Sequence, residues 1–340
     1  MKKLIYCVAV LWTLIIPASC AKKWLADATV NVTFTIATPR TIQSKVNTDG
    51  NGESTIANGH NIDSLFYEIY AKDNFDKLLG EGRTKTEEAL TDGSKTFKLT
   101  LKLVLDQPYS ILFWAHADGG YKYYDVTDLT QVKIRDNYSD FDANDESRAA
   151  FHARCDFNAD GTPQSVEMTR PFAQLNLGTS TMESSLMGDI EVKTTKVEVS
   201  NVANVFDVSE RVGRLELEGA DELSVEFNAT ATPHGSIDNT QKLLKVKTEE
   251  YHWLGMNYIV IEGARDVAST VDVTIETNAG IVTHTINNVP FGQNYRTNLI
   301  GNFLISDVTF NIIVDKLFES DRDNTTEEDF IWDNDKQTWN

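Results

Sequence analysis

Apolar and polar residues alternate with period two along most of this chain. Residues 30–36 read Val-Asn-Val-Thr-Phe-Thr-Ile, and residues 97–103 read Phe-Lys-Leu-Thr-Leu-Lys-Leu. This alternation turns one face of a β-strand to a core and the other to solvent, and it is not compatible with a surface helix. Val, Ile, Thr, Phe and Tyr dominate these runs, as is typical of half-buried strands. Further runs of this kind span residues 65–71, 110–115, 191–199, 223–229, 258–262, 270–276, 281–286 and 308–314.

The strand runs are short and are separated by polar, glycine-containing breaks. Such spacing predicts an all-β chain built from antiparallel β-sandwich domains. Helical periodicity is scarce, and only residues 87–90 and 182–187 could form a turn or two of helix. A small, polar stretch at residues 178–188 is the predicted boundary between two tandem domains, 41–180 and 181–316, followed by an acidic tail at 317–340.

Composition limits the function. The chain has 31 Lys and Arg against 51 Asp and Glu, which gives a net charge of −20 over 340 residues. A chain this acidic repels phosphate backbones, so we expect no nucleic-acid partner. No nucleophile elbow, His-Glu-x-x-His motif or phosphate-binding glycine loop is present, and the six histidines are scattered singly. The sequence therefore predicts neither an enzyme nor a cofactor.

The N-terminus carries an export signal. Lys2 and Lys3 precede an apolar run from residue 4 to 16, and small residues lead into Cys20. The run is too short to span a bilayer, which takes roughly 20 apolar residues. The segment resembles a lipobox, which implies a signal peptide at 1–19 and acylation of Cys20; the alternative is an ordinary signal peptide cut near Ala18. With Cys7 removed in the signal peptide and Cys20 taken up by the lipid, only Cys155 is left, so no intramolecular disulfide is expected.

One spacing is specific for a metal. Asp156, Asn158, Asp160 and Gly161, with Glu167 in the twelfth position, match the calcium loop D-x-[DN]-x-[DN]-G-x5-E. Alternating oxygen ligands, a glycine for the sharp turn and a final bidentate glutamate suit calcium. The same Asn-Ala-Asp-Gly segment is equally a good hairpin turn between two strands.

An aromatic cluster follows the Asp-Gly-Gly sequence at residues 118–120. Tyr121, Tyr123 and Tyr124 could stack on sugar rings, as could Trp114 if it is exposed. The alternative is cross-strand packing inside the β-structure.

The tail has an unusual composition. An acidic, polar stretch at 319–329 ends in Phe330, Ile331 and Trp332, and Trp339 follows. If this segment forms a strand, Phe330 and Trp332 face the same way. They would then enter an apolar groove on another chain; the alternative is a frayed tail whose aromatic residues are incidental.

Three parts of the chain resemble the fimbrillin family, the subunits of type V pili of Bacteroidota. The segment 170–179, Arg-Pro-Phe-Ala-Gln-Leu-Asn-Leu-Gly-Thr, resembles the strand that closes the first domain of these proteins. Residues 294–302 and 308–315 resemble the end of the second domain. The third likeness is the order of a lipoprotein signal, one strand at 28–38 and then Arg40.

The resemblance implies two transthyretin-like β-sandwich domains and a route of assembly. A lipidated precursor would reach the outer membrane with a propeptide at 20–40, and a protease would cut after Arg40. Loss of the first strand would open a groove, which a C-terminal strand of another subunit would fill. In this chain Val30, Val32, Phe34 and Ile36 form the apolar face of that first strand.

These observations predict a non-enzymatic structural subunit of a surface pilus, with other pilin subunits as partners and host glycans or proteins as further candidate partners. Three alternatives stay open: a tip or anchor subunit of the same pilus, a surface glycan-binding lipoprotein, and an enzyme. Exposed aromatic residues would favour the second alternative, and carboxylates or histidines clustered in a cleft would favour the third.

Overall fold

The structure is a computed structural model that describes residues 28–39, 46–47, 62–72, 75–85, 88–89, 95–138, 143, 148–180, 190, 192–216, 222–228, 243–246, 249–263, 267–304, 310–315, 330–333 and 338–339. The predicted signal peptide, Cys20 and Arg40 lie outside these residues. Where the structure describes the chain, no helix is long and apolar enough to cross a membrane.

The described elements are β-strands and two short 3-10 helices. In the N-terminal half they are β1 (Thr29–Ala37), β2 (Val46–Asn47), β3 (Ser64–Ala71), β4 (Lys77–Lys85), β5 (Glu88–Ala89), β6 (Lys95–Val104), β7 (Pro108–His116), η2 (Asp118–Lys122), β8 (Tyr124–Asp125), β9 (Val132–Ile134), η3 (Arg135–Tyr138), β10 (Ala150–Asn158), β11 (Gln164–Glu167) and β12 (Ala173–Ser180). In the C-terminal half they are β13 (Val192–Val199), β14 (Val205–Asp207), β15 (Val212–Arg214), β16 (Val225–Asn228), β17 (Leu243–Val246), β18 (Glu249–Ile259), β19 (Val267–Thr277), β20 (Gly280–Phe291), β21 (Arg296–Gly301), β22 (Phe310–Asp315), β23 (Phe330–Asp333) and β24 (Thr338–Trp339).

The all-β sandwich class predicted from the alternation is confirmed. Residues 88–89, which the sequence suggested as part of a helical turn, form the short strand β5 instead. The other suggested helix, 182–187, lies outside the described residues.

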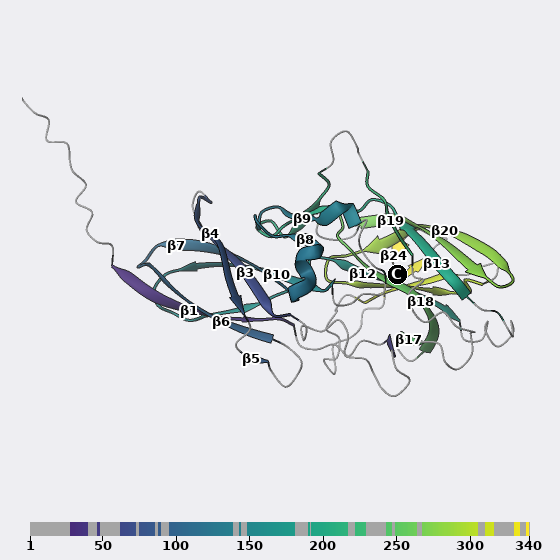
Figure 1. Ribbon diagram of the computed structural model, residues 1–340, viewed down its shortest axis with the longest axis horizontal. Coiled ribbons are helices and arrows are strands. Elements are labelled where there is room, and N and C mark those ends of the chain that lie inside the picture. Colours follow the sequence, from purple (N-terminus) through teal and green to yellow (C-terminus); the bar gives the residue numbers. More distant parts are fainter. Residues whose placement is uncertain are drawn as a thin grey trace, which may run out of the picture.

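Two four-stranded sheets make up one end of the molecule, on the left of Figure 1. Their strand orders are β11-β1-β6-β5 and β10-β7-β3-β4. The aromatic rings of Phe34 on β1 and Phe157 on β10 meet between the sheets, with centroids 5.0 Å apart. We call these two sheets the first pair.

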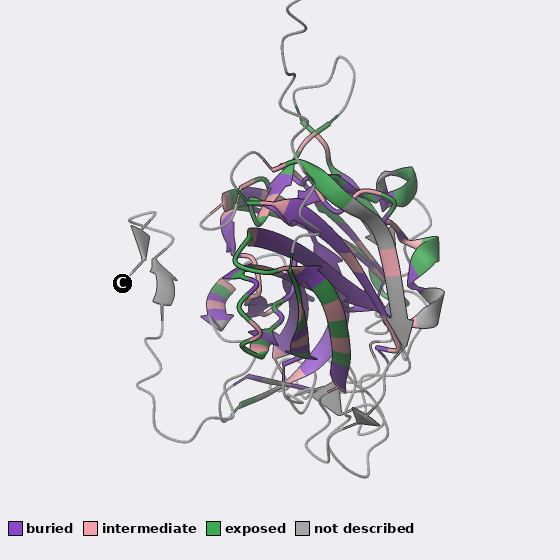
Figure 2. Cartoon of the chain, turned by 90° about the vertical axis from the view of Figure 1, so that its left-hand side faces the viewer, coloured by how far each residue is buried: buried purple, intermediate pink, exposed green. Residues whose placement is uncertain are grey.

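The other end holds an eight-stranded sheet, β2-β17-β18-β12-β21-β22-β23-β24, and a four-stranded sheet, β16-β13-β19-β20. Leu175 and Leu177 of β12 and Val197 and Val199 of β13 are completely buried in the hydrophobic core. We call these two sheets the second pair. Figure 2 looks onto the opposite end of the molecule, where buried and exposed residues alternate along strands of the first pair.

A small sheet, β15-β14-β9-β8, joins the two pairs, because β8 and β9 come from the N-terminal half and β14 and β15 from the C-terminal half. Tyr138 of η3 strengthens this joint: its hydroxyl donates to the carbonyl of Ala203 over 2.5 Å and accepts from the amide of Val260 over 3.1 Å.

The sheets do not divide at the predicted boundary between residues 180 and 181. β12, the strand expected to close the first domain, lies between β18 and β21 in the eight-stranded sheet. The short β2 also pairs with β17 of that sheet, although it comes from the predicted first domain. The small sheet crosses the same boundary, because β9 pairs with β14. The division 41–180 and 181–316 therefore stays a prediction, and two of the described sheets cross it.

Candidate functional site: strand β1 and its groove

β1 is an inner strand of its sheet. It runs antiparallel to β6 along its whole length, from Thr29 opposite Val104 to Ala37 opposite Thr96. On its other side it runs parallel to β11, but only over residues 34–37. The first five residues of β1 thus pair with one described strand and the last four with two.

The side chains of β1 alternate as the sequence predicts. Val32, Phe34 and Ile36 are completely buried, whereas Asn31 and Thr35 are exposed. The ring of Phe34 also lies 6.2 Å from that of Phe113 on β7, so it fills the space between the two sheets. Burying each of the three apolar side chains stabilises the fold by about 1.5–3 kcal/mol.

Both ends of β1 are fastened by short-range contacts. At the start, the carbonyl of Ala28 accepts from the amide of Leu105 over 2.7 Å. Next to it, Gly161 has φ +89°, and a Cβ there would lie 3.0 Å from the Cγ2 of Val30. A positive φ and this close approach are both conditions that glycine meets best. Any side chain at Gly161 would press on the apolar face of β1.

At the end of β1, Thr38 closes the strand. Its amide donates to the carbonyl of Lys95 over 2.9 Å, and its hydroxyl accepts from the amide of Lys95 over 2.8 Å. The carbonyl of Ala37 accepts from the amide of Met168 over 2.9 Å. The chain is therefore held through Thr38, two residues before Arg40. Sequence reasoning missed the role of Thr38, although a Thr-Pro step that ends an alternating run signals such a stop. It singled out Gly161 only as the turn glycine of a calcium loop and missed its close approach to Val30.

Removal of β1 would leave two strand edges without partners. β6 would lose antiparallel pairing over nine positions, and β11 would lose its only described neighbour. The buried rings of Phe113 and Phe157 would face the gap. Unpaired backbone groups and apolar surface of this kind are unstable in water and bind a replacement strand readily. A groove left in this way would expose the kind of surface to which a β-strand can add.

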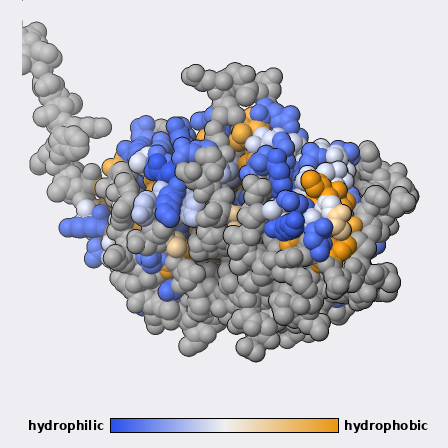
Figure 3. Space-filling model, turned by 45° about the vertical axis from the view of Figure 1, so that its right-hand side comes forward, coloured by the Kyte–Doolittle hydropathy of each residue, from blue (hydrophilic) through white to orange (hydrophobic). Residues whose placement is uncertain are grey.

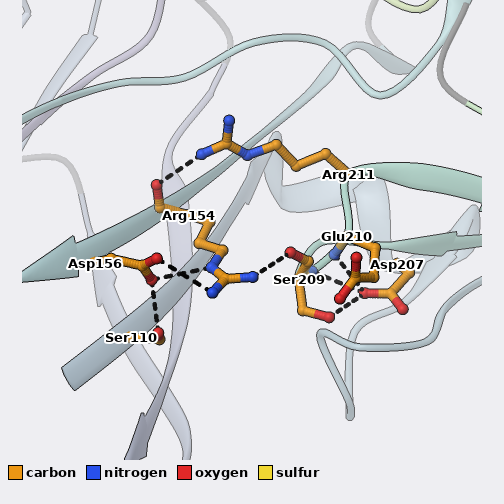
Figure 4. Close-up of polar contacts among 7 residues, drawn as sticks. All are labelled: Ser110, Arg154, Asp156, Asp207, Ser209, Glu210 and Arg211. Carbon is orange, nitrogen blue, oxygen red and sulfur yellow. Dashed lines mark hydrogen bonds and ion pairs between the residues drawn. The ribbon is translucent and has the colours of Figure 1, made fainter. Parts of the chain in front are cut away.

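A polar network ties β10 of the first pair of sheets to the turn between β14 and β15 (Figure 4). The Nε and one terminal nitrogen of Arg154 donate to the carboxylate oxygens of Asp156 over 3.0 and 3.2 Å. The other terminal nitrogen donates to the carbonyl of Ser209 over 2.8 Å. Ser209 is held in turn by the Oδ1 of Asp207, which accepts from its amide and hydroxyl. Arg211 returns a bond to the carbonyl of Arg154 over 3.1 Å. The network therefore fixes the position of the turn between β14 and β15 against β10 of the first pair.

Next to this network, His152 is buried in the joint. Its Nε2 lies 2.7 Å from the side-chain nitrogen of Gln293, and its ring centroid lies 4.6 Å from that of Phe206. Burial, with a smaller effect from the charge of Arg211, lowers the pKa of His152 to about 3. The histidine is therefore neutral in the folded chain at physiological pH.

The structure does not bring the predicted calcium ligands together. Asp156 is exposed on the outer face of one sheet of the first pair, next to buried Phe157, and Glu167 is exposed on the outer face of the other sheet, next to buried Val166. Burial opposes ionisation of Asp156, but hydrogen bonds from Arg154 and Ser110 lower its pKa overall.

Asp160 has a different role from a metal ligand. Its Oδ1 accepts from the amide of Thr162 over 2.8 Å, and this bond lowers the pKa of Asp160. Asn158 ends β10. In the described part of the chain, no group of three or more His, Cys, Asp or Glu side chains is placed to hold a metal ion. The loop is organised as the turn that joins β10 to β11.

The tyrosine cluster is mostly internal. Tyr124 is 1% exposed, and its hydroxyl donates to the carbonyl of Arg148 over 2.7 Å. Tyr123 lies under the guanidinium of Arg148, at 5.7 Å, and Trp114 is completely buried. Only Tyr121 of this group is strongly exposed, at 61%. The cross-strand packing alternative describes this cluster better than a stacking platform for sugars.

The backbone of Phe330 and Trp332 lies in β23, which continues the eight-stranded sheet of its own chain. Val314 of β22 is opposite Phe330, and Ile313 is opposite Ile331. β24 pairs with β23, with Trp339 opposite Trp332. The tail thus forms strand structure in cis, and its use in trans stays a prediction.

Fold and site define an all-β protein of packed, mostly antiparallel sheets whose first described strand fills a groove between β6 and β11. The model of a family of unknown function, DUF6562, matches residues 25–334, and the chain belongs to this family. A comparison with curated proteins finds no match.

Several solved structures of low sequence identity match this chain over most of its length. A fimbrial assembly protein from Parabacteroides distasonis is 11% identical with a TM-score of 0.46, over 85% of this chain and 96% of that one. The tip fimbrial protein Mfa3 from Porphyromonas gingivalis, truncated at its C-terminus, is 11% identical with a TM-score of 0.42, over 84% and 99%. Proteins of Bacteroides thetaiotaomicron proposed to bind polysaccharides are 14% identical with a TM-score of 0.48, over 84% and 96%. Likeness at this level concerns the fold and carries no argument about function.

Proposed function

We propose that this chain is a structural subunit of a cell-surface type V pilus that serves adhesion. It is exported as a lipoprotein acylated at Cys20, cut after Arg40 and polymerised by donor-strand exchange at the groove of β1. The observation that carries the proposal is the placement of β1: a self-contained, amphipathic strand near the N-terminus occupies an inner position of a sheet, where its departure opens a groove.

Replacement of β1 by a strand of another subunit is energetically more favourable than loss of β1 with the groove left empty. Val32, Phe34 and Ile36 are fully buried, so the groove without any strand forgoes their burial, about 1.5–3 kcal/mol for each side chain. A strand from another subunit restores this burial and the pairing with β6 and β11. Until cleavage, β1 protects the monomer from premature assembly.

The tail supplies a donor of suitable length and chemistry. After β22 ends at Asp315, the chain continues for 25 residues to Asn340. Phe330 and Trp332 alternate with Ile331 and Asp333, so a strand made from them presents two aromatic side chains on one face. The acidic residues that precede Phe330 would serve as a polar tether for such a donor.

A second candidate is a tip or anchor subunit with the same fold. An anchor keeps the lipid at Cys20, and a tip makes no use of a donor strand. A surface glycan-binding lipoprotein is a weaker candidate, because Trp114 and Tyr124 are buried. An enzyme is the weakest candidate, because the sequence carries none of the catalytic motifs named above.

The first experiment is intact mass measurement and N-terminal sequencing of the protein taken from cell surfaces. A processed subunit begins at Thr41. A chain that begins at Cys20 and carries acyl groups is a precursor or an anchor. A chain that begins elsewhere, with no lipid, contradicts the proposed route.

A further inference from the structure

β20 is an edge strand whose first seven residues, 280–286, lack the usual protection, whereas a bulge near Asn288 and then Pro290 interrupt the edge beyond them. It is last in its sheet, pairs with β19 on one side, and has no other neighbour among the described strands. Natural edge strands are blunted by charged side chains, by shortness or by bulges, because an open edge accepts further strands. β20 is twelve residues long, and its sequence, GIVTHTINNVPF, has no charged residue.

The other sheet edges of this molecule show the contrast. In the described sheets, the edge strands longer than two residues are β4, β10, β11, β15, β16 and β20. β4 carries four charged residues in nine, and β10, β11, β15 and β16 each carry at least one. β20 is the longest of them and the only one without charge, in a chain of net charge −20.

The outer face of β20 is uncharged and exposed. Ile281, Thr283, Thr285 and Asn287 are exposed, and Ile281 is 68% exposed. In Figure 3, apolar side chains gather on the right-hand part of the face that is drawn, among hydrophilic ones. Of the four large apolar side chains found exposed among the described residues, Ile281 is the most exposed.

The inner face of β20 is firmly held, so the edge has a fixed position. His284 is buried and its Nε2 donates to the carbonyl of Phe303 over 2.8 Å, while Ile286 is 3% exposed. A register shift and the positive φ of Asn288, 58°, bend the strand beyond residue 286. The straight, open part is therefore Gly280–Ile286, with Thr283 at its centre.

We propose that this arm of β20 is a self-association surface, and that its occupant is β20 of a second copy of this chain, added antiparallel about a two-fold axis at Thr283. That register places Thr283 opposite Thr283 and Ile281 opposite Thr285 on the outer face. Pairs of β-branched side chains of this kind stabilise antiparallel strands. Because the chain is strongly acidic, two copies repel each other over most of their surface. Pairing through residues 280–286 of β20 places no charged residue of one strand opposite a charged residue of the other.

The expected association is weak. Seven paired residues span about 24 Å of one sheet edge, far less than a permanent dimer interface buries. In isolation the contact therefore gives a concentration-dependent dimer. On a polymer that repeats the chain many times, the same weak contact would join neighbouring fibres through multivalency.

The test uses the full exported chain carrying Cys20→Ala and Arg40→Ala, so that neither acyl groups nor loss of β1 contributes. Sedimentation velocity over a concentration series should show a monomer–dimer equilibrium. Thr283→Lys should weaken it at least about tenfold, because two lysines would lie opposite each other across the new pair. Failure of the proposed pilus function would leave this result unchanged, since β1 stays in its groove throughout.

Thr274→Lys is the matched control, because Thr274 lies opposite Thr283 on the same face, one strand inward. In the dimer its two copies would be about 14 Å apart, three strand spacings and beyond the screening length at physiological salt. Its dimer should persist. A native chain that stays monomeric at all concentrations, or equal weakening by both lysines, would overturn the proposal.

Cross-linking is a second, independent measurement. Under mild oxidation, Thr283→Cys should give a disulfide-linked dimer, because directly opposite residues of antiparallel strands have the Cα separation that a disulfide requires. Thr274→Cys should give none. Circular dichroism of each variant checks that it is folded, and equal cross-linking of both cysteine variants would contradict the two-fold pairing.

Discussion

The ring of Phe34 on β1 meets the ring of Phe157 on β10 edge-on, with centroids 5.0 Å apart and planes at 80°. Each residue belongs to a different sheet of the first pair. The strand that the proposed route removes therefore supplies part of the contact that holds these two sheets together. A groove without β1 has lost both strand pairing and inter-sheet packing, and this explains why a replacement strand is needed.

Phe34→Ala should destabilise the uncleaved chain by about 3–5 kcal/mol, the usual cost of removing a buried phenylalanine side chain. Urea unfolding followed by circular dichroism measures this loss. Thr35→Ala, one residue along and exposed, is the control and should change stability by no more than about 0.5 kcal/mol. Equal effects of the two substitutions would contradict the packing of β1 described above.

Cys20→Ala should leave the protein without acyl groups and release it from the membrane fraction. We expect this release because the substitution removes the thiol that the lipobox-like segment would present for acylation at the new N-terminus. Fractionation of cells that express each form, with metabolic labelling by a fatty acid, is the measurement. If the variant fractionates with the outer membrane as the native chain does, Cys20 is not the anchor.

The sequence predicted β1 well because its pattern is local. Alternation in residues 30–36 is enough to tell which side chains face the core, and the structure buries Val32, Phe34 and Ile36 as expected. The pairing of β1 with β6 and β11 could not be predicted in the same way. It depends on partners that lie more than 50 residues away along the chain.

β12 shows where local reasoning fails. Gln174 and Asn176 alternate with Leu175 and Leu177, which predicts a strand with a solvent-facing side. Both polar residues are buried, and their side chains are hydrogen-bonded: Asn176 donates to Asn298 over 2.9 Å, and Arg296 donates to Gln174 over 3.1 Å. Partners 122 residues away satisfy these amides, and only the folded sheet reveals that β12 is internal on both faces.

Acid should destabilise the joint through His152. Burial holds its pKa at about 3 in the folded chain, whereas the unfolded chain takes up the proton near its ordinary value of about 6.5. Below about pH 6.5 the unfolded state binds more protons than the folded state. The free energy that neutral His152 contributes to folding is therefore fully present above about pH 6.5 and is lost steadily toward pH 3. From pH 7 to 5 the expected loss is about 2 kcal/mol.

Chemical unfolding of the native chain and of His152→Gln at both pH values tests this effect. The glutamine variant does not titrate, so its stability should fall by about 2 kcal/mol less than that of the native chain over the same interval. An identical pH dependence in the two proteins would show that His152 is not the titrating group.

Deletion of residues 319–340 should abolish polymerisation while leaving the first pair of sheets folded. The deleted stretch contains Phe330 and Trp332, the proposed donor face, and it also removes β23 and β24 from the edge of the eight-stranded sheet. Electron microscopy reports fibres, and circular dichroism reports folding. Normal fibres from the truncated chain would assign the donor strand to another segment, or would make this chain a subunit that needs none.

The most direct test of strand exchange is the state of Arg40→Ala on the cell surface, beside Lys45→Ala as a control that changes a nearby basic residue. Polymers are separated from monomers, and the N-terminus of each is sequenced. We predict that Arg40→Ala is a stable monomer that retains residues 28–40, and that native and Lys45→Ala chains form polymers beginning at Thr41. Polymers of Arg40→Ala whose subunits still carry β1 would contradict the account.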